Sequence, residues 1–88
     1  MKKTIYIMTD SHDDEPIVFT DRREAFGFMG DILISHGKYY KYDEKDIEKC
    51  LNEMADELCN NKKFFEGNLG ERQLCCYTQE VEFKEEER

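Results

Sequence analysis

The segment from Asp10 to Pro16 contains the residues whose spacing most resembles a metal site. Asp10, His12 and Asp14 stand at positions 1, 3 and 5 of a calcium-type loop, in which carboxylate oxygens would be the ligands. Glu15 occupies the position where such a loop requires glycine, and Pro16 follows it. We therefore predict no metal and no cofactor here, only a solvated turn. Binding of a metal or small ligand by residues 10–15 remains the alternative function.

Four cysteines are the other candidate metal ligands. Structural zinc sites use pairs with the spacing C-x₂₋₄-C or H-x₃₋₅-H. Cys50 and Cys59 are nine residues apart, Cys75 and Cys76 are adjacent, and both histidines lie far from every cysteine. We predict no zinc site and thiols that act as small hydrophobic side chains. The absence of a secretory leader or a long apolar run favours a reducing, cytoplasmic setting without disulfides.

The residue pattern does not favour catalysis. His36 is predicted near the end of a helix, where it would bond the last carbonyl groups or interact with the helix dipole. No serine or cysteine is placed beside it by local spacing. Paired acids are frequent, but none has the apolar setting that would raise its pKa for acid catalysis. We predict that the protein is not an enzyme and has no catalytic residue.

The segment Asp43 to Asn60 has the clearest helical pattern in the chain. Its apolar residues recur at the spacing i, i+4, i+7 and i+11, which forms one stripe on a helix. These residues are Ile47, Leu51, Met54 and Leu58. At ~100° per residue, Asp46, Glu53 and Glu57 fall within about 40° of one another, with Asp56 beside them. We expect this acidic row on the side opposite the stripe, facing water.

Such a row suggests a negatively charged binding surface. B-DNA carries one charge per ~1.7 Å of axis, whereas the helix carboxylates recur every ~6 to 10 Å, a sparse imitation of one strand. Small acidic phage proteins that mimic DNA provide a functional analogy. The simpler explanation is a solvated face that keeps the protein soluble.

Bases alternate with aromatic residues between Gly37 and Tyr42. This composition can stack on single-stranded nucleic acid, but two lysines are too few in a chain of net charge −8. We instead expect Tyr39, Tyr40 and Tyr42 to cover the helix ends and to serve as anchors in a protein interface, where tyrosine is enriched.

Length and charge limit the functional classes further. A chain of 88 residues forms one small domain with little room for an internal cavity, so its function should lie on its surface. Twenty-one acids against thirteen bases oppose direct binding to nucleic acid or to an anionic membrane and favour a basic partner.

The elements that position these residues follow from the local patterns. Strands 4–8 and 17–20 should form a hairpin, and Asp21 should cap a helix over 21–36 that Gly37 ends. In a long half-exposed strand over 72–84, Cys75, Tyr77, Val81 and Phe83 share one face and Thr78, Glu80 and Glu82 share the other. We predict an α+β domain over 1–84, followed by a frayed acidic tail over 85–88. Its sheet should be mostly antiparallel, with three or four strands, two helices on one face and the order β-β-α-α-β-β. An exposed sheet edge and the tyrosines favour a homodimer.

Two stretches, TIYIMTDSHDDEPIVFTDRREAFGFM over 4–29 and CYTQEVEF over 76–83, resemble a set of small bacterial and phage-encoded ββα…β proteins. The resemblance implies a hairpin and helix completed by a final strand, and it implies no activity. The short forms lack the helix predicted over 43–60. Taken together, we expect a non-enzymatic acidic protein-binding module. It would be a phage-type inhibitor or regulator in the host cytoplasm, occupying a basic surface of a host protein such as one that holds nucleic acid.

Overall fold

The computed structural model describes residues 2–60 and 63–82, which form four strands and two helices. The predicted α+β fold and its element order are confirmed. The elements are β1 (Lys2–Asp10), β2 (Asp13–Phe19), α1 (Arg22–Tyr39), α2 (Glu44–Cys59), β3 (Phe64–Leu69) and β4 (Arg72–Glu82). Phe83 and the predicted tail over 85–88 lie outside the described residues.

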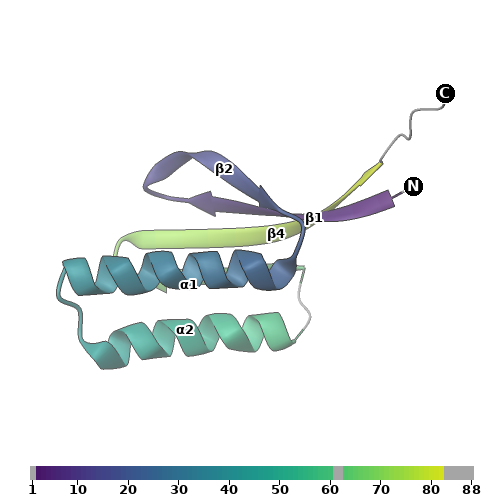
Figure 1. Ribbon diagram of the computed structural model, residues 1–88. Coiled ribbons are helices and arrows are strands. Elements are labelled where there is room, and N and C mark those ends of the chain that lie inside the picture. The colour runs from purple at the N-terminus through teal and green to yellow at the C-terminus, as the bar shows by residue number, and fades with distance from the viewer. Residues whose placement is uncertain (1, 61–62, 83–88) are drawn as a thin grey trace.

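The strands form one antiparallel sheet in the order β2-β1-β4-β3. The two central strands are therefore the first and the last of the described strands, paired from Lys2 opposite Glu82 to Asp10 opposite Leu74. A turn at Gly70, whose φ of 61° suits glycine, joins β3 to β4. Strand β2 stops pairing at Tyr6 of β1, and β3 stops pairing at Tyr77 of β4. From there toward Lys2 and Glu82, β1 and β4 continue as a two-stranded ribbon past both helices (Figure 1).

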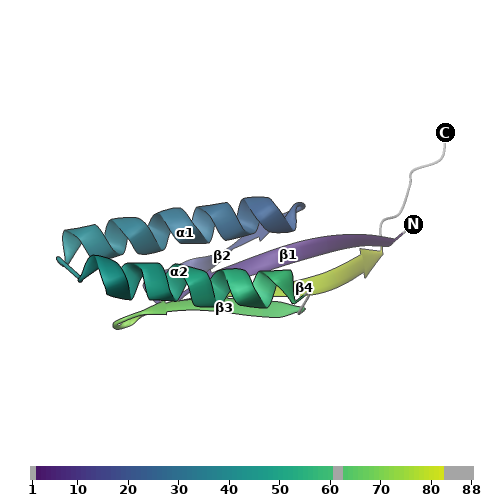
Figure 2. The ribbon, with the colours of Figure 1, turned by 90° about the horizontal axis from the view of Figure 1, so that it is seen from below.

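Both helices lie side by side on the same face of the sheet, as predicted (Figure 2). The core between the two layers is apolar. Its largest fully buried side chains are Met8, Met29, Leu33, Met54, Phe65, Leu74 and Cys76. The opposite face of the sheet has no helix over it (Figures 1 and 2).

Strand β4 alternates as expected, but its buried face is not the more apolar one. Leu74 and Cys76 are fully buried under the helices. Cys75 and Tyr77 therefore point to the uncovered face, because successive side chains alternate across a strand. Leu74 and Cys76 lie on the same face of β4 as Thr78, Glu80 and Glu82. Because these later residues are polar, the sequence pattern did not show that this face is the buried one.

Helix α1 begins as predicted and ends later than predicted. The Asp21 side chain accepts a hydrogen bond from the backbone N–H of Arg23 at 2.9 Å, a typical N-cap. Gly37 does not end the helix, which continues to Tyr39. A Cβ at Gly37 would lie 2.5 Å from Cδ1 of Ile47, so glycine is needed here for the close approach of α2. The left-handed residue after the helix is Lys41, with φ 58°.

Candidate protein-binding surface

The structure places the predicted acidic row beside the sheet rather than opposite the core. Asp46 and Glu53 line a groove between α2 and β3, together with Lys49, Asn68 and Leu69. At ~100° per residue, the centre of the acidic row is about 110° from the centre of the apolar stripe. The expectation of an opposite face was therefore wrong. Once the stripe packs on the core, the row lies along the flank of α2 next to the edge strand.

Glu57 has a structural contact in this arrangement. Its Oε1 accepts a hydrogen bond from the backbone N–H of Glu66 at 3.2 Å. Because β3 is an edge strand, this N–H points away from the sheet and has no strand partner. The Glu57 side chain thus satisfies an edge donor, and it is half-buried as a result.

Glu66 adds a fourth carboxylate at this edge and was not predicted, although its side chain points to the uncovered face of the sheet, because its neighbour Phe65 is buried under the helices. Its Oε1 accepts from Nδ2 of Asn68 at 3.3 Å, and its Oε2 lies 4.0 Å from Sγ of Cys75. In the part of the chain that the structure describes, none of these four carboxylates forms an ion pair. We name Asp46, Glu53, Glu57 and Glu66 the acidic flank.

The outward face of α2 has mixed charge. Asp56, expected beside the acidic row, lines a shallow depression there with Glu48, Asn52, Glu53 and the two lysines Lys45 and Lys49. Cations and anions alternate on this face, as they do on ordinary solvated helices. Glu53 lines both this depression and the groove beside β3, whereas Asp56 lines only the depression and is not part of the acidic flank.

The three tyrosines do not form one patch. Tyr39 and Tyr40 are exposed at the end of α1, with ring centroids 4.8 Å apart, and line a cleft of about 530 Å³. Tyr42 is half-buried and packs against Gly70 and the groove of the acidic flank. Of the tyrosines, Tyr42 alone lines the same groove as Asp46 and Glu53. The predicted binding residues thus fall on three surfaces: the groove of the acidic flank, the outward face of α2 and the cleft at the end of α1.

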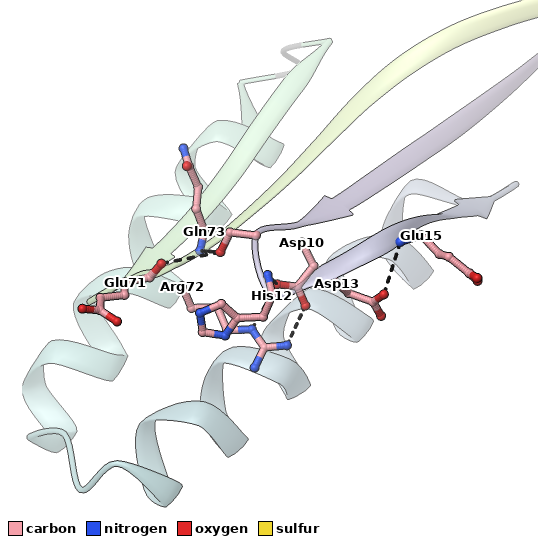
Figure 3. Close-up of polar contacts among 8 residues, drawn as sticks. Asp10, His12, Asp13, Glu15, Glu71, Arg72 and Gln73 are labelled. Atoms are coloured by element: carbon pink, nitrogen blue, oxygen red, sulfur yellow. Dashed lines mark hydrogen bonds and ion pairs between the residues drawn. The ribbon is translucent and has the colours of Figure 1, made fainter.

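The hairpin tip that resembled a metal loop is held by protein contacts (Figure 3). Arg72 donates to both carboxylate oxygens of Asp10, at 3.1 and 2.6 Å, and the N–H of His12 donates to Oδ1 at 3.0 Å. Asp13 accepts from the N–H of Glu15 at 3.2 Å. Burial alone would raise the pKa of Asp10, but the hydrogen bonds from Arg72 and His12 outweigh it and lower the pKa. Asp10 is thus an ionised partner of Arg72.

Metal-ligating residues are not gathered in space either. Over residues 2–60 and 63–82, no three histidine, cysteine, aspartate or glutamate side chains are grouped so that they could hold a metal ion. Cys50 and Cys76 are buried separately, and burial raises the pKa of Cys76 to about 11. These thiols pack as small apolar side chains.

His36 lies in the last turn of α1 but does not bond the helix carbonyls as predicted. Its side chain is 6% exposed, and its Nδ1 has no hydrogen-bond partner within the described structure. The rings of Tyr40 and His12 lie 4.7 and 5.7 Å from it. Burial and the nearby Arg72 lower its pKa, so the imidazole is neutral at pH 7 and packs in an aromatic cluster.

Comparisons with known proteins do not assign the chain to a group. No family model matches it, and neither a curated protein nor a solved structure shows significant similarity to it. Neither helix of the described chain is long and apolar enough to cross a membrane. The functional argument therefore rests on the geometry of the surfaces.

Proposed function

We propose that the protein is a non-enzymatic, acidic protein-binding module whose acidic flank occupies a basic surface of another protein. The observation that supports this proposal is the row of carboxylates along α2 and β3, which form no ion pair over residues 2–60 and 63–82 although Lys49 lines the same groove. An unpaired row of one sign creates a field that attracts a basic surface and accelerates encounter.

The spacing of the row suits a surface that normally holds nucleic acid. Asp46 and Glu53 are seven residues apart, about 10 Å along the helix, and Glu57 follows after about 6 Å. Carboxylates at these intervals match some of the phosphates of one strand, which rise by ~3.4 Å each. Glu57 is held in place by its bond to Glu66, so part of the row is preorganised.

By analogy with small acidic phage proteins that mimic DNA, the module would act as an inhibitor or regulator of a host protein in the bacterial cytoplasm. A small protein with an apolar core and surface carboxylates can inhibit another protein by occupying its binding site, without catalysing a reaction. The competing explanation is that the acids only protect the edge of β3 from pairing with other strands. Edge protection requires no particular partner.

A salt-resolved capture experiment with matched variants separates the two explanations. The full chain is immobilised, exposed to bacterial lysate freed of nucleic acid, and eluted with a salt gradient. We expect basic, nucleic-acid-binding proteins that elute as the salt rises. The purified partner is then measured against D46N/E53Q and against D14N/E15Q, which removes the same charge at the exposed hairpin tip.

The flank variant should bind about tenfold more weakly, mainly through a slower association rate, and should show a shallower salt dependence. The hairpin-tip variant should bind almost as the natural chain does. Equal affinity and equal salt slope for both variants would contradict the proposal and leave the flank as edge protection.

A further inference from the structure

A row of apolar side chains crosses the uncovered face of the sheet. Val18 pairs with Ile7, Ile7 pairs with Tyr77, and Tyr77 pairs with Phe64, so these four side chains stand side by side across all four strands. They lie opposite the face that the helices cover, because their neighbours Met8, Phe65 and Cys76 are buried. Val18, Phe64 and Tyr77 are 56%, 44% and 41% exposed.

The apolar face continues along the sheet. The register places Ile5 and Val81 on the same side as Ile7, on the ribbon that extends past the helices, each opposite a polar residue, Gln79 and Lys3. Cys75, beside Tyr77, is half-buried there. Exposed apolar patches of this extent usually mark an interaction site. A two-stranded ribbon is also only marginally stable alone, so a second layer against this face would support it.

We propose that this face binds the same face of a second copy of the chain, giving a dimer with the layers α, β, β, α. The row is self-complementary. A twofold axis parallel to the strands, between β1 and β4, would set Phe64 over Val18 of the partner copy and Tyr77 over Ile7 of the partner copy. Large side chains would then meet small ones, which is how facing layers interdigitate.

Charge also favours a second copy as the occupant. The chain carries a net charge of −8, so two copies repel unless the contact excludes their acids. From Ile5 to Thr9 and across the paired strands, Glu66 is the one charged side chain that the register places on this face, at its edge. The other three acids of the flank lie on α2, on the opposite side of the sheet. The contact would thus bring together the least charged surface of each copy.

The area is at the lower limit for such a dimer. All four strands are paired along β4 from Leu74 to Tyr77, a part about 13 Å long at ~3.3 Å per residue and about 19 Å wide at ~4.8 Å per strand, or roughly 250 Å². The ribbon and the end of β3 with β4 bring the flat footprint to roughly 500 Å² per copy. Stable specific interfaces bury about 1,200–2,000 Å² in total and weaker ones bury less, so we expect a dimer that depends on concentration.

The test is the mass of the full chain in solution as a function of concentration. Light scattering and sedimentation should show a particle of twice 10.6 kDa at high concentration. V18K/F64K places two lysines on the apolar row at edge strands, where charge is tolerated in a folded sheet. It should weaken dimerisation at least tenfold, because ammonium groups would be buried in the contact.

Y39K/Y40K is the control, since it makes the same charge change at exposed aromatic residues on the helix side. It should leave the dimer unchanged. If V18K/F64K fails to fold by circular dichroism, V18K alone, at the most exposed position of the row, is measured instead. A monomer at every concentration would overturn the proposal and reserve the face for another protein. A dimer that Y39K/Y40K dissociates and V18K/F64K does not would also overturn it.

Discussion

The acidic flank and the uncovered sheet face meet at β3, but the first is a charged surface and the second is an apolar one. The flank gathers carboxylates that have no cationic partner in the described structure, and one of them caps an edge N–H. The sheet face gathers apolar side chains in cross-strand register. Electrostatic attraction weakens with salt, whereas apolar contact does not. The comparison teaches that one small sheet can present two neighbouring surfaces whose contacts would respond differently to salt.

The adjacent residues Phe64 and Phe65 provide the largest test of this contrast. Phe65 is 1% exposed in the core, and Phe64 faces outward. F65A should cost about 3–5 kcal/mol of stability and abolish both surfaces. F64A should cost less than about 1 kcal/mol and weaken only the association of two copies. Chemical denaturation checks the first effect, and sedimentation checks the second. Similar losses of stability in both variants would contradict the assignment of the two faces.

Asp10 contrasts an internal acid with the acids of the flank. Its folded-state pKa lies below the unfolded value, so its contribution to stability is present above about pH 4 and is lost as the pH falls through the folded pKa. D10N, which leaves Arg72 without its carboxylate, should cost about 3 kcal/mol near pH 7.

The control for this prediction is E53Q, because Glu53 is exposed on the flank. E53Q should change stability by less than about 0.5 kcal/mol. Urea denaturation of both variants from pH 3 to pH 7 measures the difference. If D10N kept the stability of the natural chain at pH 7, the ion pair would not stabilise the fold.

Gly37 fixes the distance between the two helices and so the position of the flank. In G37A the new Cβ would lie 2.5 Å from Ile47 and 3.1 Å from Leu69, and the variant should lose about 1–3 kcal/mol. G27A is the matched control, because nothing lies within 4 Å of a Cβ at that helical position. It should be neutral or slightly stabilising. Thermal denaturation of the two variants checks the difference, and equal melting temperatures would contradict the close approach.

The smallest expected effect is that of metal ions. Asp10 is held by Arg72 and His12, so calcium or zinc should leave the melting temperature unchanged. Differential scanning calorimetry with and without sub-millimolar metal measures this. A rise of several degrees would show that the hairpin tip, rather than the flank, is the site that binds a ligand.

Local patterns in the sequence were sufficient for the elements but not for their contacts. Local patterns predicted both helices and the strands β1, β2 and β4, and Asp21 predicted the start of α1. Strand β3 was expected only as a place in the order β-β-α-α-β-β, without a residue range. The pairing of β1 with β4 joins residues far apart in the chain, and no local signal specifies it. Glycine is common where a helix ends, so the sequence predicted an end at Gly37. Only the close approach of Ile47 explains why this glycine lies inside α1.

The candidate surface was only partly predicted, because local patterns do not show which elements lie side by side. Asp46, Glu53 and Glu57 do share one row, since that follows from helix geometry. Where the row lies depends on β3, which also adds Glu66. The apolar face of the sheet was missed as a surface, because alternation in β4 shows two faces without showing which one the helices cover.

The central pairing of the first and last strands also constrains how the chain folds. During synthesis, β1 and β2 can form a hairpin early, but the sheet lacks its centre until β4 has left the ribosome. Contacts of such long sequence separation slow folding. Until then the apolar row on β1 and β2 and the apolar stripes of both helices stay uncovered, and such surfaces favour aggregation. These residues should therefore fold only after β4 has been synthesised and should depend on chaperones more than a helical bundle of the same size.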